Sequence, residues 1–103
     1  MPRRFRGLPI AVLPGGAVVP VASSLRSRLL GLAALPREGV PGLLIPRCRS
    51  VHTVGMRFEL DVHFLDAQGL PVSVRHRVRP GRVAFERRAR AVLEVPSASG
   101  GAG

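Results

Sequence analysis

One part of the chain constrains its fold more than any other: the run MRFELDVHF, which extends from Met56 to Phe64. Apolar residues occupy every second position of this run, and charged or polar residues occupy the positions between them. Because successive side chains of a β-strand point to opposite faces, this period of two predicts a strand with one buried face. The buried face would carry Met56, Phe58, Leu60, Val62 and Phe64, and the outer face Arg57, Glu59 and Asp61.

A second strand is predicted to follow as the other arm of a hairpin. The sequence DAQG at 66–69 suits a type I turn, which favours Asp at its first position and Gly at its fourth. Alternation then resumes over residues 70–79. Matching the two apolar faces requires residues of the same parity to pair, and Gly69 can supply the bulge that this register needs. The polar faces would then bring Glu59 and Asp61 opposite Arg75 and Arg77.

The rest of the chain predicts short elements bounded by Pro and Gly. Residues 17–22 fit an edge strand because Pro20 cannot donate a hydrogen bond to a neighbour. Residues 42–46 and 89–95 fit two more strands, and RPGRV at 79–83 fits a turn. A short amphipathic helix is also predicted: Ser23 or Ser24 would cap it, and its apolar face would hold Leu25, Leu29 and Leu32.

The length of 103 residues fits one domain. Residues 1–16 are basic and rich in Pro and Gly, which predicts a flexible lead-in, and residues 97–103 are rich in Ser and Gly, which predicts a disordered tail. The domain would occupy residues 17–96. Proline and glycine interrupt the apolar N-terminal stretch, so we expect no signal peptide, no membrane span and a cytoplasmic location.

The formal charge of +10 comes from sixteen arginines and no lysine. Together with many Ala, Gly, Pro and Val residues, this bias is typical of a GC-rich coding background, so we discount it as an indication of function. Its physical effect remains, because such a surface attracts nucleic acids and other anions without regard to sequence.

The order of the motifs resembles the DUF192 family, also called UPF0127, of small bacterial and archaeal proteins. The residues that carry the resemblance are SVHTVGM at 50–56, LDVHFLD at 60–66 and RAVLEVP at 90–96. The resemblance implies an α+β fold, mainly a curled, half-barrel-like antiparallel sheet with one or two short helices. It implies no agreed biochemical activity.

Nucleophilic and metal chemistry find little support in the spacing of the reactive residues. Cys48 and His52 would lie roughly 13 Å apart along a strand, too far for a thiol and its base, so Cys48 is interpreted as a small apolar residue. Ser50 and His52 would lie about 6.7 Å apart and would need a third partner. That partner could be Asp61, Asp66, Glu86 or Glu94. The three histidines, His52, His63 and His76, have no metal-ligand spacing, so no metal is predicted.

The sequence therefore favours a small binding or accessory domain that is not an enzyme, has no cofactor and binds an unknown small molecule or protein. The candidate binding residues, on the concave side of the sheet, are Ser50, His52, Thr53, Met56, Arg57 and Arg79. Two other functions stay open: a hydrolase-like enzyme that uses His52, and a nonspecific nucleic-acid binder with an arginine-rich surface. A purely structural role is the further possibility, in which Ser50 and Thr53 bond to the backbone and His52 is a bonded sheet residue. The oligomeric state is not predicted.

Overall fold

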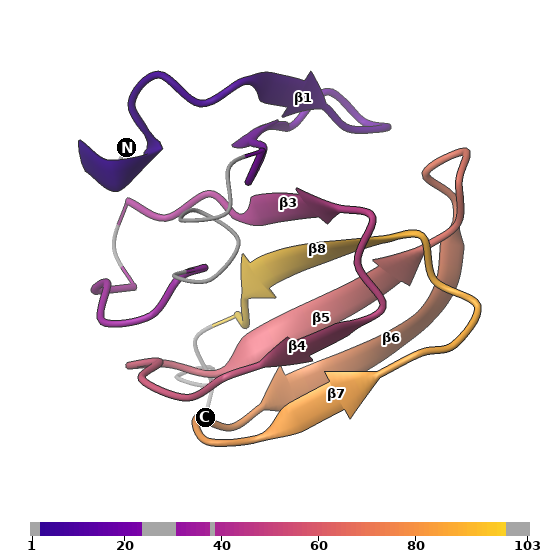
Figure 1. Cartoon of the computed structure of the whole chain (residues 1–103). Helices are drawn as coiled ribbons and strands as arrows, with labels where there is room; N and C mark the ends of the chain where they lie inside the picture. Colours follow the sequence, from indigo (N-terminus) through magenta and orange to yellow (C-terminus); the bar gives the residue numbers. More distant parts are fainter. Residues whose placement is uncertain (1–2, 24–30, 38, 99–103) are drawn as a thin grey trace.

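The structure is a computed structural model that describes residues 3–23, 31–37 and 39–98 (Figure 1). Within these residues it contains one short 3-10 helix, η1 (Arg3–Phe5), and eight strands. The strands are β1 (Ile10–Val12), β2 (Val18–Pro20), β3 (Leu43–Pro46), β4 (Ser50–His52), β5 (Leu60–Leu65), β6 (Pro71–Val78), β7 (Val83–Phe85) and β8 (Ala91–Pro96).

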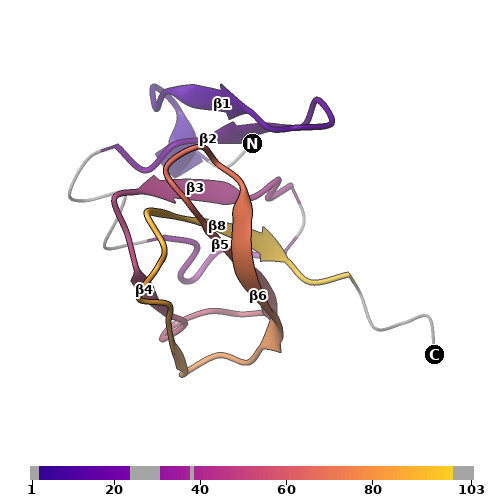
Figure 2. The ribbon, with the colours of Figure 1, turned by 90° about the vertical axis from the view of Figure 1, so that its right-hand side faces the viewer.

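Four of these strands form the central antiparallel sheet, in the order β3-β8-β5-β6. β8 and β5 are its inner strands, and each of them pairs along its whole length with the other. Two small sheets, β1-β2 and β4-β7, pack against it. β6, an edge strand of the central sheet, is curved along its length, as Figure 2 shows.

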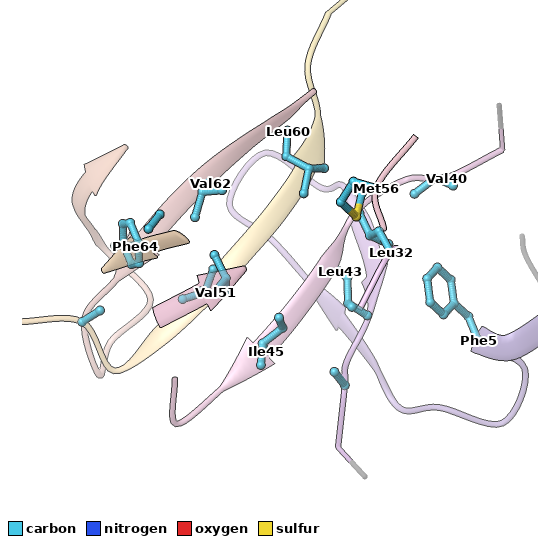
Figure 3. Packing of buried hydrophobic residues seen from close by; sticks show 14 residues of the cluster. Phe5, Leu32, Val40, Leu43, Ile45, Val51, Met56, Leu60, Val62 and Phe64 are labelled. Carbon is cyan, nitrogen blue, oxygen red and sulfur yellow. The ribbon is translucent and has the colours of Figure 1, made fainter. Parts of the chain in front are cut away.

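The two faces of the central sheet carry separate hydrophobic clusters. On one face, Leu60, Val62 and Phe64 of β5 are fully buried and pack with Val51 of β4 and Ala84 of β7 (Figure 3). On the other face, Leu65, Leu93 and Val19 form a smaller cluster, which the β1-β2 hairpin covers. The small sheets thus complete the burial that a single sheet cannot achieve alone.

The alternation predicted for residues 56–64 is largely confirmed. Met56 is buried with Leu60, Val62 and Phe64, and Phe58 is half-buried against the same cluster. The strand itself is shorter than predicted and begins at Leu60, because a turn and a bend precede it.

The hairpin turn is also confirmed. The Gly69 N–H donates to the Asp66 carbonyl at 3.0 Å, and the Asp66 N–H donates to the Leu70 carbonyl at 2.8 Å. Gly69 has a φ of 83°, as a type I turn followed by a glycine bulge requires. The Asp66 carboxylate accepts two further N–H groups, from Gln68 and Leu70, both at 2.9 Å.

The register predicted for this hairpin is correct only at its two ends. Leu65 pairs with Pro71 and Leu60 with Val78, but between them Phe64 pairs with Ser73. Two irregularities in β6 cause the shift, and Arg77, with a φ of 53°, lies at one of them.

The shifted register changes which side chains of β6 meet the rest of the molecule. Arg75 lies over the Phe64 ring, with 5.7 Å between the guanidinium carbon and the ring centroid, instead of facing the acidic residues. Arg77 does meet Glu59, at 3.2 Å, as predicted.

The predicted α+β class is wrong, because the described residues are nearly all β. Most of the predicted helix falls on residues 24–30, outside the described residues, but its last apolar member, Leu32, lies in a turn. Gly31 and Ala34, on either side, have φ values of 50° and 64°, and left-handed backbone does not continue an α-helix. The antiparallel sheet is the part of the prediction that is confirmed.

Residues 3–16, predicted to be a flexible lead-in, contain β1 and the buried Phe5. Phe5 packs into the larger cluster together with Leu32, Val40 and Leu43. At the other end, Ser97 is buried and its hydroxyl donates to Asp61 at 2.7 Å. Residues 99–103 of the predicted tail lie outside the described part of the chain.

Phe64→Ala should lower the free energy of unfolding by about 3–5 kcal/mol, because it empties a fully buried site in the larger cluster. Phe85→Ala is the matched control: this phenylalanine is 59% exposed, so its loss should cost about 0.5 kcal/mol or less. Urea unfolding followed by circular dichroism measures both. Equal losses for the two variants would contradict the core described above.

Candidate functional site

One face of the small β4-β7 sheet presents apolar and polar side chains to solvent. Ser50 pairs with Phe85, Val51 with Ala84, and His52 with Val83. Val51 and Ala84 face the core and are buried. The alternation of β-strands therefore turns the other four side chains outward. We call Ser50, His52, Val83 and Phe85 the β4-β7 face.

Half of this face is apolar and exposed. Val83 is 76% exposed and Phe85 59% exposed, although both residues are apolar and lie on a paired strand. The polar partners Ser50 and His52 are exposed as well. This face lies on the outer side of the β4-β7 sheet, away from the core.

Thr53 fixes the loop that leads into β7. It is buried, its hydroxyl donates to the Arg79 carbonyl at 2.6 Å, and the same oxygen accepts the Arg82 N–H at 2.8 Å. Its backbone N–H donates to the Arg82 carbonyl at 2.8 Å, and its carbonyl accepts the Gly81 N–H at 3.0 Å. The role of Thr53 is therefore structural: it holds β7 beside β4.

The ring of His52 is held by its own backbone. Its Nδ1 accepts the Val54 N–H at 3.3 Å. In the part of the chain that the structure describes, no carboxylate or thiol bonds to this ring. Cys48 is half-buried and packs against the larger cluster, and its thiol donates to the Ser50 carbonyl at 3.0 Å.

The six predicted binding residues thus divide into three groups. Ser50 and His52 lie together on the β4-β7 face. Thr53 and Met56 are buried: Thr53 bonds to the loop before β7, and Met56 packs in the core. Arg57 and Arg79 are exposed, and the backbone carbonyl of Arg79 accepts the hydrogen bond from the Thr53 hydroxyl.

The four acidic residues considered as partners for Ser50 and His52 have other roles. Asp66 shapes the hairpin turn, and Glu86 accepts hydrogen bonds from Ser73 at 3.1 Å and from Arg88 at 3.2 Å. The bonds from Arg88 lower the pKa of Glu86 to about 2, so it stays charged. Asp61 and Glu94 belong to the central sheet.

Asp61 is the centre of a second polar cluster, on the face of the central sheet away from β4-β7. It accepts the Ser97 hydroxyl and the Arg77 N–H, and its carboxylate lies 3.5 Å from His76 Nδ1. Burial alone would raise the pKa of Asp61, but these bonds outweigh it and the pKa is lowered. Because the buried Ser97 donates to a carboxylate and not to a histidine, this cluster is not arranged as a nucleophilic triad.

Metal binding finds no support in the geometry. Among the residues that the structure describes, no group of three or more His, Cys, Asp or Glu side chains is placed to hold a metal ion.

The sequence analysis did not predict the exposed positions of Val83 and Phe85 on a strand. RPGRV at 79–83 predicts a turn, and the turn is present, but Val83 begins β7. The signal that was available is the triplet VAF at 83–85, in which two residues with high β-propensity flank an alanine. Three residues are too few for periodicity to reveal a strand.

The β4-β7 face lies within strongly basic segments of the chain. Residues 47–57 and 79–90, which contain β4, β7 and their flanks, hold eight of the sixteen arginines but only one of the six acidic residues, Glu86. Eight positive charges and one negative charge leave a net +7 of the total +10. All eight side chains are exposed: Arg47, Arg49, Arg57, Arg79, Arg82, Arg87, Arg88 and Arg90. The field at this end of the molecule is therefore positive.

Comparison with known proteins places the chain in a family. The family model DUF192, described as "Uncharacterized ACR", matches residues 15–100, so the chain belongs to this family, as its motifs predicted. No curated protein matches the chain.

A solved structure shares the fold. The crystal structure of a protein of unknown function from Novosphingobium aromaticivorans is similar with a TM-score of 0.67, at 16% identity over 94% of this chain and 87% of that one.

Within the described residues, no helix has the length and apolar character needed to cross a membrane.

Thr53→Val should lower the free energy of unfolding by about 1–3 kcal/mol, because it leaves the Arg79 carbonyl and the Arg82 N–H without their part-buried hydrogen bonds to the hydroxyl. Thr53→Ser, which keeps the hydroxyl, is the control and should lose less. Urea unfolding gives the stability, and amide exchange at Val83 and Ala84 reports whether β7 has loosened. A valine variant as stable as the serine variant would show that the Thr53 hydroxyl does not stabilise the loop before β7.

Glu94 should make stability depend on pH. Its side chain is 3% exposed, and this burial raises its pKa to about 7 from the usual 4.5. Because the folded-state pKa exceeds the unfolded one, stability should fall as the pH rises from about 4.5 to 7 and then stay constant. The total loss would be about 3 kcal/mol.

Glu94→Gln should remove this loss. Burial lowers the pKa of His63, which changes stability with pH in the opposite sense, so the difference between wild type and Glu94→Gln isolates Glu94. Urea unfolding between pH 5 and 8 measures it. A difference that does not change over this range would contradict the assignment.

Proposed function

We propose that the chain is a small non-catalytic binding domain and that the β4-β7 face, together with the arginines around it, binds an anionic ligand. The observation that carries the proposal is the exposure of Val83 and Phe85 on a strand whose segment, together with that of its partner β4, carries a net charge of +7 in the sequence. Exposed apolar side chains grouped within a charged rim are typical of interaction surfaces. The proposal keeps the predicted cytoplasmic location.

The rigidity of the sheet supports this use of the face. Val51 and Ala84 anchor the opposite side in the core, and Thr53 ties the loop before β7 to the end of β4. A ligand would therefore meet side chains whose backbone is already in place, which reduces the entropy lost on binding.

The hydrolase alternative has less support. A general base needs a hydrogen-bonded nucleophile and a group that orients the base, whereas Nδ1 of His52 takes a backbone N–H from Val54. Ser50 lies two residues away on the same strand face and is not bonded to the ring in the described part of the chain.

The test is a titration of the isotopically labelled protein with inorganic polyphosphate, followed by NMR. We expect the amide shifts to concentrate in residues 47–57 and 79–90. Arg82→Glu combined with Arg87→Glu should weaken binding by about tenfold or more, since it removes phosphate contacts. Arg3→Glu with Arg6→Glu makes the same change in net charge at two exposed arginines near the N-terminus and should weaken binding much less. Equal losses for the two double variants would refute the proposed surface.

A further inference from the structure

We infer that the β4-β7 face binds single-stranded nucleic acid, with bases stacked on Phe85 and His52 and phosphates held by the neighbouring arginines. This inference rests on the proposed function and names the class of its ligand. Three features of the face support it: the spacing of the His52 and Phe85 rings, the hydroxyl of Ser50 beside both rings, and the arginines near the two strands in the sequence.

The two rings are diagonal neighbours on one sheet surface. His52 pairs with Val83, two residues before Phe85, and both side chains point outward. Diagonal neighbours lie about 7–8 Å apart, more than the 3.4 Å rise of stacked nucleotides in a strand. The spacing therefore suits neighbouring bases of an extended strand, each stacked on its own ring.

A polar group lies beside both rings. Ser50 pairs directly with Phe85 and lies two residues before His52 on the same face. Its hydroxyl bonds to no side chain or backbone group in the described part of the chain, and it is exposed. A hydroxyl both donates and accepts, so it can contact the edge of any base, which fits binding with little sequence preference.

The arginines flank this surface in the sequence of both strands. Arg49 directly precedes Ser50, Arg82 directly precedes Val83, and Arg87 follows Phe85 by two residues. All three are exposed, and the ion pairs of the described residues involve none of them. Exposed rings with exposed arginines nearby in the chain supply the two features that bind single strands, because each nucleotide brings one planar base and one negative charge.

Duplex DNA fits the face less well. Its bases are stacked on each other, and its major groove admits an α-helix or a protruding β-ribbon. β4 and β7 have three residues each, and one of their two faces is packed on the core. An anionic membrane would match the charge and the apolar side chains, but it would not require an aromatic ring at position 85.

The experiment measures fluorescence anisotropy with labelled oligonucleotides of about twelve nucleotides, within the usual site size of single-strand binders. The probes are a mixed-sequence single strand, the same sequence as a duplex, and an abasic sugar-phosphate strand of equal length. Phosphatidylserine vesicles are tested by sedimentation. We expect the single strand to bind about tenfold more tightly than the abasic strand, since it adds stacking to charge.

Two variants separate stacking from charge. Phe85→Leu keeps an apolar side chain but removes the ring, and it should weaken single-strand binding about tenfold without changing abasic binding. His52→Leu should act in the same direction. Leu70→Ala is the control, because Leu70 is 57% exposed in the β5-β6 turn, and it should change neither. Circular dichroism confirms that each variant is folded.

The outcomes distinguish this inference from the proposed function. Equal binding of the single strand and the abasic strand, with no effect of Phe85→Leu, would overturn stacking and leave an anion-binding surface. Binding to vesicles that depends on Phe85, without binding to the single strand, would also overturn it. If reversal of Arg82 and Arg87 leaves polyphosphate, abasic and single-strand binding unchanged, both proposals fail.

Discussion

The pairing of β5 with β8 supports everything else in this molecule. These two inner strands supply buried side chains to both faces of the central sheet: Val62, Phe64 and Val92 on one side, Leu65 and Leu93 on the other. Each face then needs a cover, since one sheet cannot exclude water from both of its sides. The β4-β7 sheet covers the first face and the β1-β2 hairpin covers the second.

The β4-β7 sheet is a single layer, so when one of its faces packs on the core, its other face is left in solvent. β4 and β7 have three residues each, so each contributes one side chain to the core and two to solvent. Burial of Val51 and Ala84 therefore fixes the direction of Ser50, His52, Val83 and Phe85, whatever those residues are. The core does not require Val83 and Phe85 to be apolar, and the proposed ligand would account for their apolar character.

The sequence predicted the elements whose signals are local and could not predict those that depend on distant partners. The alternation at 56–64, the DAQG turn and the strand at 89–95 each contain their own pattern, and the structure has all three. The register of β6 depends on bulges at an edge strand, where the Arg77 N–H bonds to the Asp61 carboxylate instead of a ladder carbonyl. Phe5 is the converse case: it is surrounded by arginines in the sequence, and only the folded chain shows the core that it fills.

The candidate site also combines residues that local sequence signals predicted with one that depends on a distant partner. Its position in the chain also bears on the interpretation of the net charge. The motif SVHTVGM identified Ser50 and His52, but Phe85 joins them only through a pairing between strands more than thirty residues apart in sequence. A biased composition alone would spread the arginines behind the +10 charge along the chain without regard to structure. The distribution is nevertheless uneven: half of the arginines, and one of six acids, lie in the segments that carry the exposed rings. Glu86, that one acid, is paired with Arg88, and its hydrogen bond to Ser73 holds it against β6. Composition can explain how many arginines the chain has, but it does not explain why the exposed rings of His52 and Phe85 lie in the segments that hold half of them.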